Sequence, residues 1–179
     1  MSKRTDILAA AEKRVRTGGY DNFSFRDIAA DVGIKSASVH YHFPTKGSLG
    51  QALVADYTHR FFAALETDDH AEEWLSHYIA MFRRALVDEQ LMCLCGLLGA
   101  ESDGVPEEVN AETKVFFERN LQYLVNQLEV NHSMSQSQAA NTASLILSAL
   151  EGAMIVAKAT GDNARFDQAI ASLQGFISQ

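Results

Sequence analysis

The sequence predicts an all-α fold. Strand signals are sparse, because β-branched residues are scattered and apolar residues do not alternate with polar ones. Apolar residues instead recur at three- and four-residue spacing, as they do on one face of an amphipathic helix. At 179 residues and 47% hydrophobic, the chain is long enough to bury a core, in one large domain or in one small and one medium domain.

The N-terminal part of the chain predicts two short helices. The first helix has one apolar face, which comprises Ile7, Leu8, Ala11 and Val15. It is expected to end at Gly18-Gly19, because glycine tolerates the left-handed conformation of a helix C-cap. Ser24 is a suitable N-cap for a second helix, and Asp27 favours the positive end of that helix. The buried stripe of the second helix is predicted to be Phe25, Ile28, Ala29 and Val32, and Gly33 ends it.

Helical patterns continue to the end of the chain. A third short helix is predicted to begin near Ser36 and to end at Pro44, and a fourth runs from Lys46 to about Leu65 with Thr45 as its N-cap. The polar stretch 66–70 is the expected boundary between two modules. Beyond it we expect helices, with ends correct to within a few residues, at 71–89, 91–101, 106–130, 135–160 and 164–178. Ser135 and Gln138 have the spacing of a capping box, which supports the start of the penultimate helix.

Charge is divided unevenly along a chain whose net charge is −8. Residues 1–50 contain eight Lys or Arg and five Asp or Glu, which gives +3. Residues 51–179 contain seven and eighteen, which gives −11. Phosphate groups are therefore attracted only to the N-terminal part, and the acidic remainder discourages unspecific binding to a duplex.

Residues 24–43 have the spacing of a helix-turn-helix. Ala29 is small where two helices must cross closely, and Gly33 allows the chain to reverse. Ile34 and Val39 are expected to be buried. Such a unit presents its second helix to the major groove of DNA. The side chains of this segment that are left for phosphates and base edges are Lys35, Ser36, Ser38, His40, Tyr41 and His42.

This N-terminal block closely resembles the TetR family of repressors over about residues 1–50. The runs that carry the resemblance are Phe25-Arg26-Asp27-Ile28-Ala29, Val32-Gly33-Ile34 and Val39-His40-Tyr41-His42-Phe43-Pro44-Thr45-Lys46-Gly47-Ser48-Leu49. The resemblance implies an all-helical fold of about nine helices, with the first three forming the DNA-binding domain. We therefore predict a helix-turn-helix domain over residues 1–47 and an effector-binding and dimerisation domain over residues 48–179.

The resemblance also implies roles for individual residues. The recognition helix is about Ser36 to His42, Lys46 contacts phosphate, and Ser24 and Arg26 face the DNA backbone. Other members carry varied side chains at the positions of Ala37 and Ser38, so the operator sequence stays open. The predicted DNA-binding residues are Ser24, Arg26, Lys35, Ser36, Ala37, Ser38, His40, Tyr41, His42 and Lys46. The expected partner is double-stranded operator DNA, with two recognition helices of a homodimer one helical turn apart.

Apolar and aromatic residues recur at helical spacing in the middle of the chain, where they form an ordinary core or line a pocket. The resemblance implies a pocket among these helices, and Met and aromatic side chains suit a largely apolar small-molecule effector. An effector that prefers the non-binding conformation releases the operator, so a ligand-responsive repressor is the expected function. The predicted pocket residues are Trp74, Tyr78, Phe82, Met92, Cys95, Leu98, Phe116, Phe117 and Tyr123.

Cys93 and Cys95 allow two interpretations. They are one residue apart on an apolar segment, where a strain-free disulfide between them is not expected. They are either buried, inert thiols, or one of them senses oxidants or electrophiles within the same repressor framework. No Lys or Arg lies near them in the sequence to lower the pKa of a thiol, but residues on the following loop can still supply a charge in space. Both interpretations therefore stay open.

The last two predicted helices are rich in small residues, which let helices approach closely. Their apolar character extends around much of the circumference. We therefore predict a four-helix dimer interface made of both copies of residues 135–178, with internal packing alone as the alternative.

Other classes of protein are disfavoured. A helical enzyme with a cysteine nucleophile lacks a visible partnering base. His40 and His42 are two residues apart on a helix and point to different sides, so we expect no shared metal ion, and no cofactor is expected. A helical adaptor that binds only protein, and an activator in place of a repressor, remain open. We see no leader and no apolar run long enough to cross a bilayer, so we expect a cytoplasmic protein.

Overall fold

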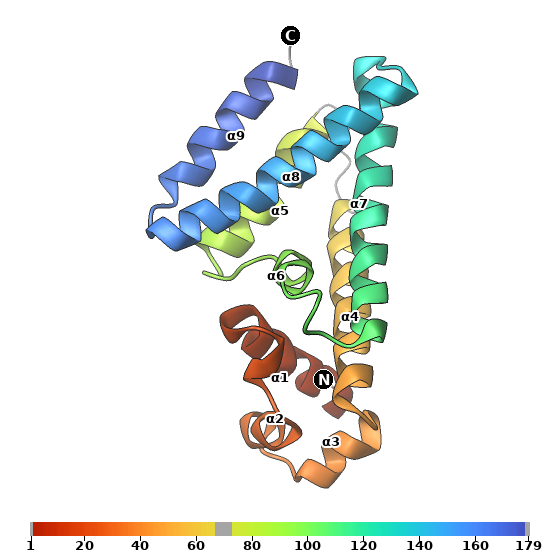
Figure 1. Ribbon diagram of the computed structural model, residues 1–179, viewed down its shortest axis with the longest axis vertical. Coiled ribbons are helices and arrows are strands. Elements are labelled where there is room, and N and C mark those ends of the chain that lie inside the picture. Colours follow the sequence, from red (N-terminus) through yellow and green to blue (C-terminus); the bar gives the residue numbers. More distant parts are fainter. Residues whose placement is uncertain (1, 67–72, 178–179) are drawn as a thin grey trace. The chain divides into compact units, whose positions relative to one another are not determined.

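The computed structural model describes residues 2–66 and 73–177, which form nine α-helices and one short 3-10 helix without any strand (Figure 1). The predicted all-α fold class is therefore confirmed. The helices are α1 (Lys3–Gly18), the 3-10 helix η1 (Tyr20–Asn22), α2 (Phe25–Val32), α3 (Ser36–His42), α4 (Lys46–Glu66), α5 (Trp74–Val87), α6 (Leu94–Ala100), α7 (Glu107–His132), α8 (Gln136–Thr160) and α9 (Ala164–Ile177).

Several helix ends lie where the sequence signals predicted them. The predicted capping box at the start of α8 is present, because Ser135 and Gln138 each bond the other's backbone N–H. Thr45 caps α4, since its hydroxyl accepts the N–H of Ser48 at 2.9 Å. Gly161 ends α8 in the left-handed conformation with a φ of 67°. The local rules for helix ends therefore account for much of the helix pattern.

Other boundaries differ from the prediction. The helix expected at 91–101 begins only at Leu94, and the short connection before Ser24 contains the unpredicted η1. The expected boundary at 66–70 falls almost wholly outside the described residues. The start of α6 and the η1 segment lack a capping signal in the sequence, so tertiary packing decides where the backbone departs from helical geometry there.

The chain divides into two compact units. The first comprises Met1–Ala63 and Leu94–Phe116, and the second comprises Ala64–Cys93 and Phe117–Gln179. The first unit thus contains the whole helix-turn-helix segment together with α6 and the start of α7. The functional boundary at residues 47 and 48 stays a prediction.

The core of the first unit lies under α1, α2 and α3. All four residues of the predicted α1 face are buried, as are Ile28 and Ala29 of α2. Phe25 and Val32, which the sequence placed in the same stripe, are only half-buried. Farther along, the rings of Tyr57 and Phe61 on α4 pack against Phe116 on α7, at centroid distances of 5.7 and 5.3 Å. The apolar core of the first unit therefore includes residues of the N-terminal helices, of α4 and of the start of α7.

The second unit is built around α5, α8, α9 and the C-terminal part of α7. Helices α8 and α9 pack along one another, and α8 also packs on α5. The guanidinium of Arg83 on α5 donates to the carboxylate of Asp167 on α9 at 2.8 and 3.2 Å. The largest buried apolar side chains of this unit include Leu124, Leu128, Ile146 and Phe166.

Helix α8 is long and rich in apolar residues. By length and composition alone it would be able to cross a membrane, with a mean hydropathy of 1.4 over its most apolar window. Of that window, 39% is buried inside the structure. A helix that packs on neighbours along one side and keeps an apolar outer side gives the same result, so the composition is weak evidence for a membrane.

Candidate nucleic-acid interface

A short, well-defined turn joins α2 to α3. At the start of α2, the Ser24 hydroxyl accepts the N–H of Asp27 at 3.3 Å, and the Asp27 carboxylate accepts the N–H of Ser24 at 2.9 Å. Hydrogen bonds from the Ser24 hydroxyl and backbone lower the pKa of Asp27. At the other end Gly33 has a φ of 68°, and the next N–H, of Ile34, donates to the carbonyl of Ala29 at 2.9 Å. The glycine is required here because a side chain rarely adopts this conformation.

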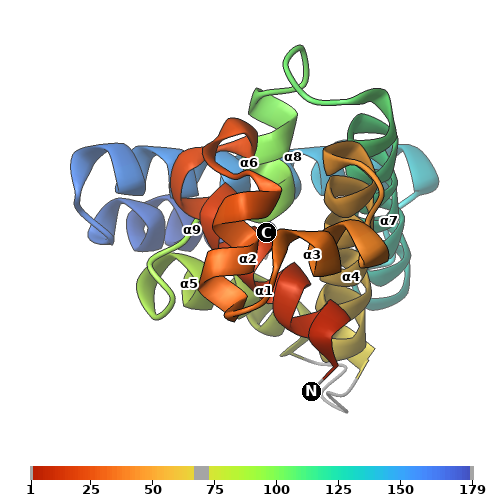
Figure 2. The same ribbon diagram turned by 90° about the horizontal axis from the view of Figure 1, so that it is seen from below.

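Packing from one side fixes the position of α3. Val39 is fully buried, and Phe43, which follows the helix, is 3% exposed. The His40 ring lies edge-on to the ring of Phe25 on α2, with centroids 4.5 Å apart. The guanidinium of Arg4 on α1 lies 5.3 Å from the centroid of the Phe43 ring. Helix α2 therefore packs against α3, as Figure 2 shows from the end of this unit, and α1 contacts the residue that follows α3.

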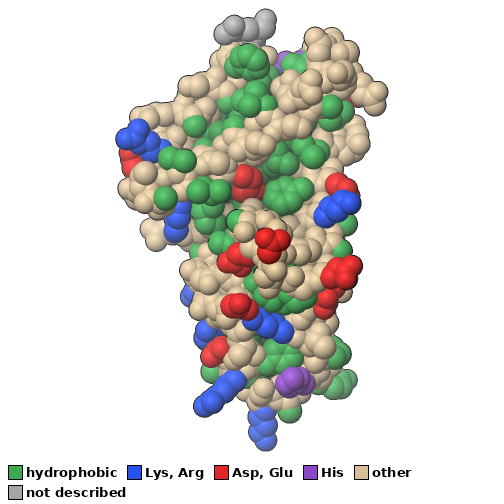
Figure 3. Space-filling view, in the orientation of Figure 1, with side chains coloured by type: hydrophobic (Ala, Val, Ile, Leu, Met, Phe, Trp, Pro, Cys, Tyr) green, Lys and Arg blue, Asp and Glu red, His purple; other side chains and the backbone are tan. Residues whose placement is uncertain are grey.

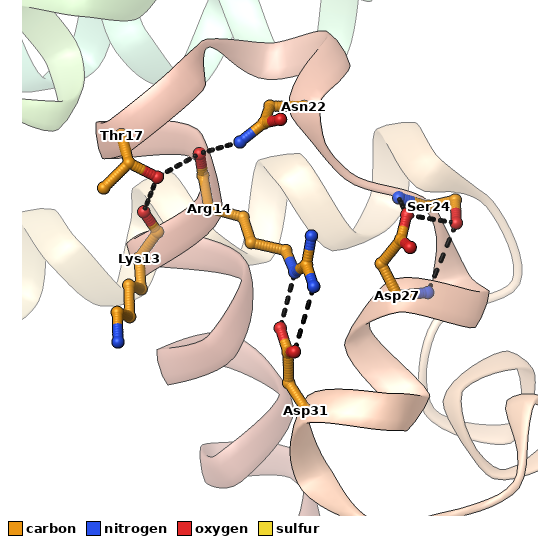
Figure 4. A network of polar contacts seen from close by, with 7 residues as sticks. All are labelled: Lys13, Arg14, Thr17, Asn22, Ser24, Asp27 and Asp31. Carbon is orange, nitrogen blue, oxygen red and sulfur yellow. Dashed lines mark hydrogen bonds and ion pairs between the residues drawn. The ribbon is translucent and has the colours of Figure 1, made fainter.

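An ion pair joins α1 to α2 (Figure 4). The Arg14 guanidinium donates two hydrogen bonds to the Asp31 carboxylate, at 2.5 and 2.9 Å, and the bond from Arg14 lowers the pKa of Asp31. Asn22 donates to the backbone carbonyl of Arg14 at 3.1 Å, which ties η1 to the same helix. The pair is solvent-exposed, so salt will weaken it, but its two-pronged geometry specifies how α2 lies on α1.

Lys46, at the start of α4, is held in place by three groups. Its ammonium lies 3.2 Å from a carboxylate oxygen of Asp21 and 4.7 Å from the ring centroids of both Tyr20 and Phe23. The Tyr20 hydroxyl also donates to the carbonyl of Lys46 at 3.1 Å. Burial, together with the charges of Glu108 and Asp21, raises the pKa of Tyr20 to about 12. The lysine is therefore ordered while its side chain keeps 34% exposure.

Glu101, which directly follows α6, contacts Tyr20, and the sequence analysis did not predict this contact. Its carboxylate accepts the backbone N–H of Tyr20 at 2.8 Å. The preceding Gly19 has a φ of 85°, which side chains rarely adopt, and a Cβ there would lie 2.3 Å from the other carboxylate oxygen and displace it. Glu101, Tyr20 and Lys46 therefore form a continuous chain of contacts from the end of α6 to the start of α4. No pattern in the sequence marks this pairing, because its two ends are 81 residues apart.

The predicted DNA-binding residues gather at one end of the first unit. Figure 3 shows Lys, Arg and His side chains projecting there. Tyr41 is 85% exposed, which is the largest value among the exposed large hydrophobic side chains of the described residues. The exposed members of the set are Ser24, Arg26, Lys35, Ala37, His40 and Tyr41, and the half-buried ones are Ser36, Ser38, His42 and Lys46.

The predicted pocket residues are divided between the two units. In the second unit Tyr78 contacts two other members of the set, with ring centroids 5.4 Å from Phe82 and 5.7 Å from Tyr123, and it stacks on the latter. The Tyr78 hydroxyl donates to the side-chain carbonyl of Asn120 at 2.7 Å. Of the whole set, the buried members are Trp74, Tyr78, Phe82, Met92, Cys95, Leu98 and Phe116, and the half-buried ones are Phe117 and Tyr123.

Both cysteines are buried, and neither forms a disulfide within the described part of the chain. The structure places an acid near one of them that the sequence did not indicate: Glu151 on α8 lies close enough to Cys93 for the thiol to lower the pKa of the carboxyl. Burial acts more strongly in the other direction and raises the pKa of Glu151 to about 7. The two positions are 58 residues apart in the sequence, which explains why no local motif reveals the pair.

A helical fold with an outward-facing second helix in a helix-turn-helix defines the chain as a DNA-binding transcriptional regulator. Residues 7–53 match the family model described as bacterial regulatory proteins of the tetR family. Residues 71–172 match the model described as the C-terminal domain of LmrA/YxaF-like transcriptional regulators. The chain therefore belongs to the TetR family, as its resemblance over residues 1–50 predicted, and ligand-responsive repression is the general function of this family.

Solved structures agree with the family models. A TetR transcriptional regulator from Legionella pneumophila is 31% identical with a TM-score of 0.89, and the alignment covers 100% of this chain and 97% of that one. A TetR-family regulator from Agrobacterium tumefaciens is 31% identical with a TM-score of 0.87 and 96% of both chains covered. A regulatory protein TetR from Rhodobacter sphaeroides, 18% identical with a TM-score of 0.84 over 94% and 95% of the chains, shares the fold. The comparison with curated proteins gives no match.

Because α3 is buried on one side only, substitutions on its two sides should change the free energy of unfolding by very different amounts. Replacement of the fully buried Val39 by alanine should lower the free energy of unfolding by about 2 kcal/mol, because it opens a cavity under the helix. Replacement of Tyr41 by alanine should change it by less than about 0.5 kcal/mol, because the side chain is exposed. Urea unfolding followed by circular dichroism measures both values. Equal losses in the two variants would contradict the arrangement described for α3.

The buried Glu151 predicts a pH dependence of stability. Its pKa is raised from 4.5 to about 7 in the folded chain, so folding favours the protonated form. Stability should therefore fall as pH rises from about 4.5 through about 7, by about 3 kcal/mol as an upper estimate. The Glu151→Gln variant should lack this loss, whereas a Glu129→Gln variant at an exposed site on α7 should retain it. Chemical unfolding at pH 5 and pH 8 gives the comparison, and parallel profiles for wild type and Glu151→Gln would refute the assignment.

Proposed function

We propose that this protein is a homodimeric repressor that binds palindromic operator DNA through α3 and releases it when a small-molecule effector binds. The exposure of Tyr41, two residues after the fully buried Val39, is the observation that carries the proposal. A helix of seven residues that is anchored on one side offers its other side to a groove. The acidic remainder of the chain favours the positive N-terminal part as the contact with phosphates.

The residues around α3 are suited to contact both base edges and phosphates. Lys35, Tyr41 and His40 are exposed side chains with donors for base edges or phosphates. Lys46 is held at the start of α4 by aromatic rings and one carboxylate, and such an ordered ammonium loses little side-chain entropy when it binds phosphate. Asp21, its ionic partner, is 95% exposed, so it is free to separate from the lysine when a phosphate takes its place.

Two substitutions test the DNA-binding face. Tyr41→Ala should weaken binding to the DNA upstream of the protein's own coding sequence by about 10- to 100-fold, because it removes a contact at the centre of the interface. Lys46→Ala should weaken binding to all sequences and reduce the slope of log affinity against log salt by about one. Fluorescence anisotropy at several salt concentrations measures both effects.

A matched control separates these effects from a general loss of positive charge. Arg165, near the start of α9, is an exposed cation in the second unit, so Arg165→Ala should leave both the affinity and the salt slope unchanged. If Tyr41→Ala and Lys46→Ala bind DNA as tightly as wild type while folding normally, α3 is not the recognition helix.

The outer side of α8 supports a dimer interface. Leu145, Ile155 and Val156 are 44%, 52% and 50% exposed, and Phe176 on α9 is 64% exposed. Figure 3 shows hydrophobic side chains over α8 and α9 on the visible face. A Cβ built on Gly152 would meet no heavy atom within 4 Å among the described residues. A large apolar face with open space over a glycine suits close packing against a second copy, in agreement with the interface predicted over residues 135–178.

A bulky charge at Gly152 should disrupt this interface. Gly152→Arg fits within one chain, since the added side chain points into open space, and arginine has a higher helix propensity than glycine. We expect a monomer of undiminished helix content by analytical ultracentrifugation, with at least about 10-fold weaker operator binding, because one recognition helix reads only half a site. Gln122→Arg on the exposed side of α7 is the control and should remain dimeric. A dimeric Gly152→Arg protein would exclude α8 as the interface.

The contacts within the first unit suggest how α6 influences the DNA-binding end. Glu101 follows α6 and binds the backbone of Tyr20, which in turn contacts Lys46. A displacement of α6 would therefore disturb the start of α4 and the η1 segment. The effector needs only a preference of a few kcal/mol for the displaced conformation to release the operator.

The sensor alternative based on thiols has weaker support. Cys93 and Cys95 are 2% and 0% exposed, and Cys93 lies beside the carboxyl of Glu151. Burial and a neighbouring negative charge both disfavour the reactive thiolate. The family models describe transcriptional regulators, which gives no support to the helical enzyme or to an adaptor that binds only protein.

A further inference from the structure

The carboxylate of Glu151 is an unusual group for the interior of the second unit. Both of its oxygens are buried, and neither has a hydrogen-bond partner of ordinary geometry among the described residues. The thiol of Cys93 lies beside it, but a thiol is a weak donor and carries no positive charge. Buried carboxylates are normally paired with a cation or with strong donors, because an unpaired one destabilises the fold. An unpaired acid at this position therefore calls for a functional explanation.

Tyr78 and the thiol of Cys93 lie near the carboxyl of Glu151. Tyr78 is close enough for the carboxylate and Cys93 to add to the effect of burial in raising the pKa of the tyrosine. Its ring stacks on Tyr123 at 5.7 Å with an angle of 19° between the planes, and its hydroxyl is occupied by Asn120. No ion pair to Glu151 occurs within the described part of the chain. A buried carboxyl without a cationic partner, beside the Tyr78 ring, suits an organic cation, because an ion pair with the cation favours the ionised carboxylate.

We propose that Glu151 binds a positively charged amine on an otherwise apolar effector, with Tyr78 and Tyr123 contacting its body. The inference rests on the proposed repressor function and specifies the chemical class of its effector. Tyr78 and Tyr123 already belong to the predicted pocket, and Glu151 adds an ionisable group that selects charge.

Charge neutralisation would also give the effector its preference between conformations. The carboxylate oxygens are enclosed by their own chain, while the rest of the Glu151 residue is half-buried. An amine reaches these oxygens only if the surrounding side chains or helices shift. The conformation that admits the amine is therefore stabilised by the new ion pair, and the closed conformation is not. A ligand changes an equilibrium only through such a difference.

A set of matched probes tests the proposal. 4-Phenylbutylamine, 4-phenylbutanol and 4-phenylbutyrate share one apolar body and differ in charge, and dodecylamine with dodecanol, below micellar concentrations, provides a second body. Isothermal titration calorimetry measures binding, and fluorescence anisotropy measures the release of upstream DNA. For wild type we expect at least one amine to bind about tenfold more tightly than its alcohol and to release DNA at lower concentration. The phenylbutyrate should bind most weakly, because like charges repel.

Substitution of the carboxylate identifies the group responsible. Glu151→Gln keeps the size of the side chain and should remove the preference for the amine, with the affinity for the alcohol unchanged within about twofold. Glu129→Gln, at an exposed acid on α7, is the control and should keep the preference. If Glu151→Gln fails to fold, the comparison of amine, alcohol and acid in the wild type still decides whether the site selects a cation.

Three results would overturn the proposal. The first is a wild type that binds neither amine better than its alcohol, and the second is a preference for the amine that survives in Glu151→Gln. The third is a change in the dimer dissociation constant of Glu151→Gln in the absence of probe, which would show that a partner subunit supplies the missing cation. A wild-type protein that does not bind DNA contradicts the repressor function instead, and calorimetry still reports the charge selectivity in that case.

Discussion

The burial of one side of α3 is the constraint on which the DNA-binding end depends. A helix of seven residues is too short to be stable by itself, so its position comes from its neighbours. Val39 is enclosed by the first unit, and the left-handed Gly33 sets the direction in which the chain enters the helix. Because one side is enclosed, the following residues His40 and Tyr41 face solvent. Recognition of DNA thus depends on an apolar contact that never touches DNA.

Polar contacts at the ends of helices connect this apolar contact to the charged groups around it. Arg14 and Asp31 specify how α2 lies on α1, and Glu101 joins the end of α6 to Tyr20. Tyr20 contacts Lys46 through its ring and its hydroxyl. Each of these bonds is modest in energy, but hydrogen bonds are directional, so they transmit position as well as stability. A small movement of α6 would therefore reach the residues that surround the recognition helix.

The second unit combines apolar surface on its outside with one buried acid in its interior. Its interior is mostly apolar, and its outer surface on α8 and α9 is also partly apolar, which indicates association with another copy. Within it Glu151 lowers stability by being buried without a partner of opposite charge. A regulator needs two conformations of similar energy, and a destabilising group that a ligand can neutralise brings them closer together. Stability and responsiveness are thus opposed at this residue.

The sequence by itself determined the helical class, most helix ends and the helix-turn-helix. These features depend on periodicity, on capping residues such as Ser24 and Ser135, and on glycine at Gly33, all of which act over a few residues. Only the tertiary structure decided which groups far apart in sequence meet: Glu101 with Tyr20, and Glu151 with Cys93. The physical reason is that a single acid on a helix looks the same in the sequence whether it faces water or the interior. Its burial and its partners depend on the packing of helices that no local pattern records.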